Sequence, residues 1–150
     1  MATRYSLQTI LLSRFLWAAT TQGATEGGLE MRNHRLAPCP SSPNCVCTLG
    51  NSQSHFMPPY RYRNTLEEAK TGLKQVFSEM SRTELIQEED IYLHYEVTSL
   101  LARFVDDVEI LFDDATKSIH FRSAARTGYY DFGVNRRRME EVRSRLDDQG

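Results

Sequence analysis

Hydrophobic residues in the middle of the chain recur first at helical spacing and then at every second position. The helical run opens with a capping box, in which Thr65 and Glu68 each cap the other's backbone amide. The pattern therefore predicts a helix over Thr65–Met80 with one apolar face. That face consists of Leu66, Ala69, Leu73, Val76, Phe77 and Met80.

Beyond Thr83 the spacing changes to two, which is typical of strands with one buried face. Three segments show this spacing: Ile91–Val97, Arg103–Phe112 and Ser118–Ser123. Short connections between them, such as the turn-forming Asp113–Lys117, predict an antiparallel meander. The expected inward positions are Ile91, Leu93, Tyr95, Val97, Phe104, Asp106, Val108, Ile110, Phe112, Ile119 and Phe121.

A second helix is predicted near the C-terminus, over Asn135–Leu146, with Asn135 as its N-cap. The order helix, strands, helix predicts an α+β fold. We expect an antiparallel β-meander sheet with two helices packed on one face, a two-layer sandwich. The chain has 150 residues, enough for one domain with a substantial core, which we place at residues 34–147.

Residues 1–33 carry a different pattern. Ile10–Ala19 is largely apolar but is interrupted by Arg14, and it is too short to span a bilayer, which needs about 20 apolar residues. The segment fits either a degenerate signal sequence or a short amphipathic helix. Thr20–Gly28, with three glycines, is typical of a linker. We therefore expect a signal-like or helical N-terminal arm followed by a linker, and no transmembrane segment.

The chain's three cysteines, Cys39, Cys45 and Cys47, lie in or just after a proline-rich loop. A disulfide between Cys39 and Cys45 would close a small loop and suit an oxidising compartment. Free thiols in a reducing compartment are a second interpretation. A metal site that adds His34 is a third, although its spacing is unusual for zinc.

Charge is unevenly distributed along the chain. The net charge of -2 argues against a nucleic-acid binder, which would usually be basic. Residues 84–114 nevertheless contain ten acidic side chains against one arginine, and residues 122–138 contain five arginines against one aspartate. The two segments are close in sequence, so we expect them to pair within the fold.

Asp106 is expected on the apolar face of its strand, where an unpaired carboxylate would be strongly unfavourable. We predict that Asp106 or Asp107 pairs with Arg122 or Arg126, and that Glu109 belongs to the same structural network. The other interpretation of Asp106 is a buried anion site in which it orients an arginine.

The opposite face of the sheet should be polar, with two histidines among three carboxylates. One interpretation is the solvated face that such a sheet requires. The alternative is an acid–base site, in which His94 or His120 acts with Asp107 or Glu109. The residues expected on this face are Tyr92, His94, Glu96, Asp107, Glu109, His120 and Arg122.

The most informative stretch is Arg122–Arg138. Three of its arginines, 136 to 138, would occupy the first turn of a helix, where the macrodipole disfavours cations. A carboxylate elsewhere in the fold or an anionic ligand should therefore face them. Gly128 and Gly133 are expected to adopt positive φ. The candidate ligand- or partner-binding residues are Arg122, Arg126, Tyr129, Asp131, Asn135, Arg136 and Arg138.

Three separated motifs resemble the family called domain of unknown function 1499. They are Leu36–Val46, Phe104–Glu109 and Arg122–Arg138, and the resemblance covers most of residues 34–146. Cys47, where a serine is expected, and Ala125, where a second serine is usual, depart from it. The resemblance implies no established activity. It implies an extracytoplasmic or organellar location, since many relatives are exported or lipid-anchored.

These observations favour a non-catalytic binding or assembly module, such as an accessory subunit of a larger assembly. Its arginine-rich motif would meet an acidic protein partner or a small anion. The alternative is a small hydrolase or transferase with its site on the open sheet face. We assign no catalytic residue, metal ligand or cofactor, and expect no nucleic-acid partner.

Overall fold

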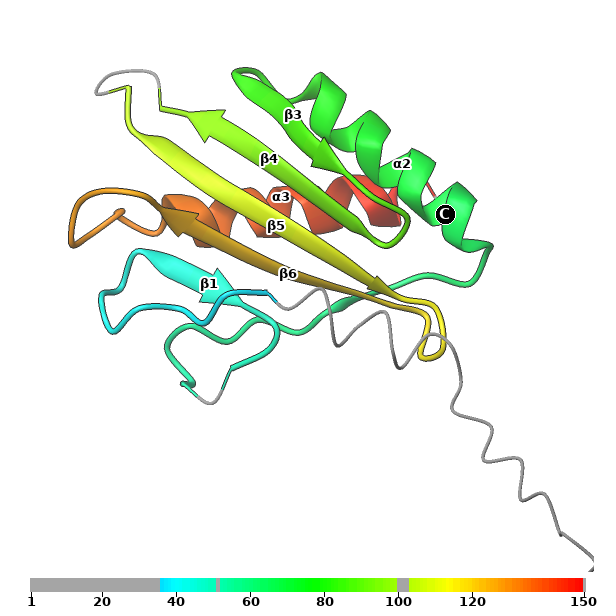
Figure 1. Cartoon of the computed structure of the whole chain (residues 1–150), viewed down its shortest axis with the longest axis horizontal. Helices are drawn as coiled ribbons and strands as arrows, with labels where there is room; N and C mark the ends of the chain where they lie inside the picture. Colours follow the sequence, from blue (N-terminus) through cyan, green and yellow to red (C-terminus); the bar gives the residue numbers. More distant parts are fainter. Residues whose placement is uncertain (1–35, 51, 100–102, 150) are drawn as a thin grey trace, which may run out of the picture.

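The computed structural model describes residues 36–50, 52–99 and 103–149 (Figure 1). These residues form a six-stranded antiparallel sheet and two helices, so the fold is α+β as predicted. The strands lie in the order β1-β6-β5-β4-β3, with β2 also pairing β6. The elements are β1 (Cys45–Cys47), β2 (Tyr60–Arg61), α2 (Leu66–Glu79), β3 (Thr83–Glu88), β4 (Tyr92–Thr98), β5 (Val105–Asp113), β6 (Ser118–Ala125) and α3 (Val134–Asp147).

Helix α2 begins where the sequence predicts. The Thr65 hydroxyl accepts a hydrogen bond from the Glu68 amide at 3.3 Å, and the Glu68 carboxylate accepts one from the Thr65 amide at 2.9 Å. The pair satisfies two amides that the helix itself leaves without partners. The helix then buries Leu73, Val76 and Phe77 completely against the sheet.

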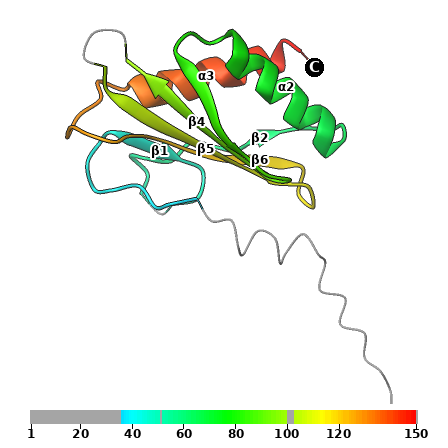
Figure 2. The same cartoon turned by 45° about the horizontal axis from the view of Figure 1, so that its top comes forward.

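Both helices cover the same face of the sheet (Figure 2). Side chains of α2 and α3, including Leu73, Phe77 and Met139, join the inward side chains of β4, β5 and β6 in one hydrophobic core. Phe77 stacks on Tyr95 of β4, with ring centroids 4.2 Å apart. The predicted two-layer arrangement is therefore confirmed, and no helix of the described residues covers the other face of the sheet, here called the open face.

Three predictions about individual elements need correction. Strands β1 and β3 were not predicted: β1 is only 3 residues long and follows the proline-rich loop, whereas the side chains of β3 are mostly exposed and a bulge between Leu85 and Gln87 breaks its alternation. Phe104 was expected inside but is 53% exposed, since it precedes the first residue of β5. Asn135 is not the N-cap of α3; that position is Gly133. The predicted N-terminal arm, residues 1–33, lies outside the described residues.

Candidate functional site

The start of α3 is stabilised by Asp131. Its carboxylate accepts hydrogen bonds from the amides of Gly133 (2.9 Å) and Asn135 (3.0 Å). A carboxylate here also complements the positive end of the helix. Burial raises the pKa of Asp131, but the bonds from Asn135 and Gly133 outweigh it and hold the pKa below its usual value. Gly128 and Gly133 have positive φ, as predicted.

Asn135 instead lies in a buried polar network. Its side chain is fully buried, and its Oδ1 accepts hydrogen bonds from the Ser123 hydroxyl (2.5 Å) and from Nη1 of Arg138 (2.7 Å). Nη2 of Arg138 donates to Oδ2 of Asp106 at 2.6 Å. Asp106 therefore pairs with Arg138, whereas the sequence favoured Arg122 or Arg126. The network joins α3 to β5 and β6.

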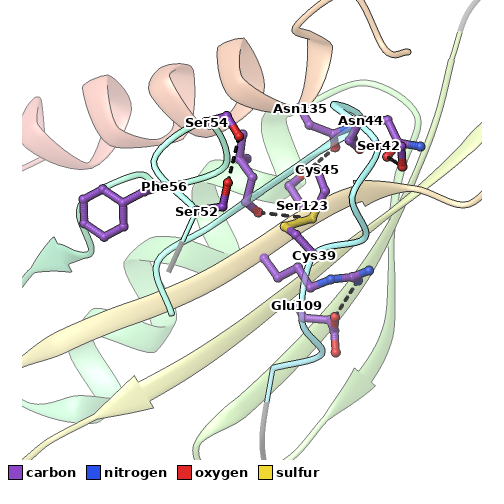
Figure 3. Close-up of a disulfide and its surroundings, with 12 residues drawn as sticks. Cys39, Ser42, Asn44, Cys45, Ser52, Ser54, Phe56, Glu109, Ser123 and Asn135 are labelled. Atoms are coloured by element: carbon purple, nitrogen blue, oxygen red, sulfur yellow. Dashed lines mark hydrogen bonds and ion pairs between the residues drawn. A yellow bond between two sulfur atoms is a disulfide. The ribbon is translucent and has the colours of Figure 1, made fainter. Parts of the chain in front are cut away.

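The same network reaches the loop before β1 (Figure 3). Asn44 donates from Nδ2 to the Gly128 carbonyl at 2.6 Å, and its own carbonyl accepts from Nδ2 of Asn135 at 3.3 Å. Ser42 fixes the Asn44 side chain through a bond of 2.8 Å to Oδ1. The proline-rich loop and the arginine-rich motif, about 80 residues apart in sequence, are thus parts of one hydrogen-bonded structure.

A disulfide joins Cys39 to Cys45. Of the three interpretations of the cysteines, the structure supports this one; it excludes a metal site built on both residues and leaves Cys47 as a buried free thiol. Cys45 opposes Ala124 of β6, so the crosslink holds the loop against the edge of the sheet.

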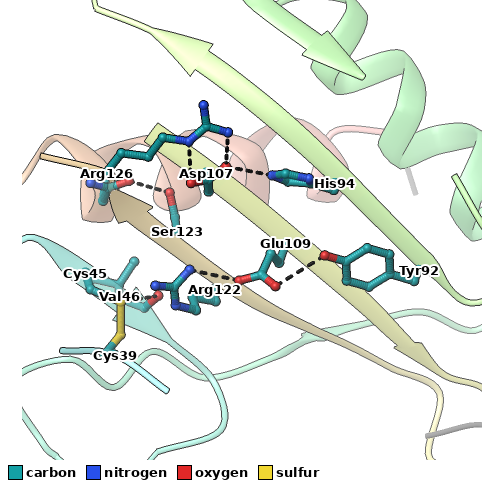
Figure 4. A network of polar contacts seen from close by, with 11 residues as sticks. Cys39, Cys45, Val46, Tyr92, His94, Asp107, Glu109, Arg122, Ser123 and Arg126 are labelled. Carbon is teal, nitrogen blue, oxygen red and sulfur yellow. Dashed lines mark hydrogen bonds and ion pairs between the residues drawn. A yellow bond between two sulfur atoms is a disulfide. The ribbon is translucent and has the colours of Figure 1, made fainter. Parts of the chain in front are cut away.

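Two groups of charged side chains lie on the open face (Figure 4). In the first, Arg126 donates to both oxygens of Asp107, at 2.7 and 2.8 Å, and also to Glu96. His94 approaches the same Asp107 at 2.7 Å. Burial raises the pKa of Asp107, but bonds from Arg126 and His94 more than offset this, and its net pKa is lowered. The sequence predicted that the acidic segment 84–114 pairs with the arginine-rich segment 122–138, and the Asp107–Arg126 ion pair is such a contact.

The second group is built on Glu109, which accepts from Arg122 at 2.8 Å and from the Tyr92 hydroxyl at 3.2 Å. His120 does not join either group. Its Nδ1 lies 3.2 Å from the Thr48 hydroxyl, and burial lowers its pKa. Of the predicted His–carboxylate combinations, the fold therefore forms only His94 with Asp107 among the ion pairs of the described residues.

The remaining arginines of the motif bind backbone carbonyls. Arg136 donates to the carbonyls of Ser54 (2.9 Å) and Phe56, and Arg137 donates to that of Phe132 (2.8 Å). The cations in the first turn of α3 are thus offset mainly within the fold, and among the described residues Asp106 is the carboxylate that pairs with Arg138. Arg138 is buried, so the arginines do not form the single surface that the sequence suggested.

The most exposed large hydrophobic side chains of the motif are aromatic. Tyr129 is 74% exposed and Phe132 76%, and Tyr130 packs edge-on against Phe132 with ring centroids 5.0 Å apart. We call these three residues the aromatic tip. The sequence indicated Tyr129 as a candidate but not Tyr130 or Phe132. Their signal was the presence of three aromatic residues, with Asp131 among them, between two glycines, a pattern that fits neither a strand nor a helix face.

The aromatic tip lies at the end of the sheet where β4 and β6 finish and β3 and β5 begin, on the left in Figure 1. We call this end the sheet end; Phe104 also lies there. Two surface grooves open at it, of about 460 and 500 Å³, and neither is lined by a histidine. In the described ranges, no three His, Cys, Asp or Glu side chains are grouped so as to hold a metal ion.

The architecture defines a small disulfide-bonded α+β domain in which polar side chains of the motif form hydrogen bonds and ion pairs within the fold. The chain belongs to the family described as "Protein of unknown function (DUF1499)", whose model matches residues 35–146. Searches of curated proteins and of solved structures gave no match. Neither helix in the described part of the chain is long and apolar enough to cross a membrane.

Proposed function

We propose that this protein is a non-catalytic binding module of a larger assembly and that it meets an acidic protein partner through its C-terminal motif. One observation carries the proposal. The polar side chains of the motif bond within the fold, whereas Tyr129, Tyr130 and Phe132 of the same motif project into solvent. Exposed aromatic side chains close together are typical of protein interfaces.

The base of the aromatic tip is held on both sides, which favours binding. Asn44 fixes the Gly128 carbonyl before the tip, and Asp131 fixes the amides of Gly133 and Asn135 after it. A loop that is ordered before it binds loses less conformational entropy in the complex. The hydrogen bonds of the motif's polar residues thus help to hold the exposed aromatic tip in place.

The disulfide supports an extracytoplasmic or organellar location. Disulfides persist in oxidising compartments, and Cys39 and Cys45 form one here. A partner would then be found among exported or organellar proteins.

A second candidate function is hydrolysis or group transfer at His94. The 2.7 Å contact between His94 Nε2 and Asp107 resembles the carboxylate–imidazole pairs that orient catalytic histidines. In this candidate His94 would act as the acid or base. It is the weaker candidate, because Arg126 occupies both oxygens of Asp107 and neither groove of the sheet end reaches His94.

Affinity capture from a native extract tests the proposal, with mass spectrometry of both proteins and small molecules. The wild-type chain is compared with Tyr129→Ser/Tyr130→Ser and with Leu49→Ser, a control at another exposed apolar residue. We expect a protein partner that the double variant loses and the control retains. A small molecule lost only in His94→Ala would support the second candidate instead. Capture of neither would contradict the proposal.

A further inference from the structure

Backbone conformation at the sheet end is unusual. Among the described residues, four non-glycine residues have positive φ: Arg82, Arg103, Lys117 and Phe132. Lys117 belongs to the hairpin between β5 and β6, but the other three lie at the sheet end. Such a conformation is unfavourable for residues with a side chain, and it is retained when the surrounding structure or function requires it.

Phe132 is the clearest case. It combines a φ of 54° with a side chain that is 76% exposed, so it has neither a relaxed backbone nor substantial burial. Its carbonyl holds Arg137, but any residue would provide that carbonyl. Asparagine or glycine would fit the backbone better. Folding therefore does not explain a phenylalanine here, whereas contact with a partner does.

The groove beside the aromatic tip carries uncompensated positive charge. It has a volume of about 500 Å³ and is bounded by Val134 and Arg137 of α3 and by Arg82 after α2. Arg82 donates to the Thr98 carbonyl at 3.0 Å and Arg137 to the Phe132 carbonyl, so neither guanidinium pairs with a carboxylate within the described residues.

The acidic side chains of this groove are already paired. Glu79 and Glu141 both contact Arg145, at 3.5 and 2.7 Å. The four arginines of the lining (82, 137, 138 and 145) stand against these two glutamates and Asp106, so the groove has an excess of one positive charge. Asp106 compensates Arg138 from beneath. The groove is thus suited to bind carboxylates. The exposed aromatic side chains of the neighbouring aromatic tip are suited to pack against apolar side chains.

We infer that the sheet end binds an acidic, extended segment of a partner protein. Carboxylates of that segment contact Arg82 and Arg137, and an apolar side chain packs on Phe132 and Tyr130. The inference rests on the proposed function and specifies its surface and partner. A peptide is favoured over a bilayer because the cations line a concave groove and the chain has a net charge of -2.

A phage-displayed library of random peptides, selected on the full chain, tests this directly. We expect enriched peptides in which Asp or Glu alternate with apolar residues. Phe132→Asn should weaken the binding of a synthetic copy of such a peptide at least about tenfold, as expected for the loss of an aromatic anchor at an interface. Arg82→Gln should weaken it and reduce the dependence of binding on salt. Lys117→Gln, a matched cation with positive φ at the opposite end, should have no effect.

Several results would overturn the inference. They are enrichment of basic peptides, equal binding by Phe132→Asn, Phe132-dependent sedimentation with vesicles of phosphatidylcholine and phosphatidylglycerol without any acidic peptide, or a Phe132-dependent dimer in ultracentrifugation. If native capture finds a partner that Phe132→Asn and Arg82→Gln both retain, this inference fails while the proposed function stands. If no protein partner is captured at all, the proposed function fails as well.

Discussion

Arg138 of α3 and Asp106 of β5 form a buried ion pair, with both side chains only 8% exposed and 2.6 Å between Nη2 and Oδ2. The pair fastens the C-terminal helix to the middle of the sheet. It also makes an inward-facing carboxylate tolerable, because a buried charge needs a partner of opposite sign.

Asp106→Ala should therefore lower the free energy of unfolding by about 3–5 kcal/mol, since it leaves Arg138 buried without its carboxylate. Urea denaturation measures this. Glu140→Ala, at an exposed position on the same helix, is the control and should change stability by less than about 0.5 kcal/mol. An Asp106→Ala variant that is as stable as the wild type but loses a ligand or partner would show that the carboxylate is functional and would contradict its structural role.

Asn135→Ala removes the centre of the polar network. In a fully buried place, the substitution removes the hydrogen-bond acceptor of the Ser123 hydroxyl and one acceptor of the Arg138 guanidinium. We expect a loss of about 2–4 kcal/mol, because buried polar groups without partners are costly. Asn64→Ala, an exposed asparagine, serves as the comparison in the same thermal melts. Equal melting temperatures for the two variants would contradict the network's structural role.

The disulfide closes a short loop, with a sequence separation of 6 between its cysteines. Chain-entropy arguments give about 2 kcal/mol of stabilisation for a loop of this size. Cys39→Ser/Cys45→Ser should lose that amount, and dithiothreitol should destabilise the wild type equally but leave the variant unchanged. If dithiothreitol destabilises the double variant too, the effect has another origin.

Acidification should destabilise the fold through Asp107 and Asp131. Both have a pKa below the ordinary value, which is close to that of the unfolded chain, about 3.9. Their contribution is therefore complete above about pH 4 and is lost as the pH falls through the folded-state pKa. Asp131→Asn should be less stable at neutral pH and show a flatter decline below about pH 4. A decline as steep as in the wild type would contradict this assignment.

Local signals were sufficient to predict most of the fold. The capping box of Thr65 and Glu68 and the alternation along β4, β5 and β6 depend on neighbouring residues only, and all are present. The sequence pattern did not predict strand β3, because pairing with β4 at the sheet edge, and not burial, holds this strand in place. Its adjacent apolar residues, Leu85 and Ile86, are both exposed.

The site was predictable only where strand register determines it. Asp107 and Arg126 come from neighbouring segments, and their pairing followed from the meander. The partner of Asp106 depends on how α3 packs across the sheet, which no local pattern encodes. The exposed conformation of Phe132 could not be predicted from the sequence either, because its φ of 54° contradicts the local backbone preference of phenylalanine.

The thermal stability of Phe132→Asn tests the central claim most directly, namely that the motif is divided into a buried structural half and an exposed recognition half. The variant gives up an exposed ring contact and relieves a backbone conformation that costs roughly 1–2 kcal/mol for most residues. We predict a melting temperature equal to or above that of the wild type. A loss of more than about 2 kcal/mol would show that Phe132 is a structural residue and would contradict the account.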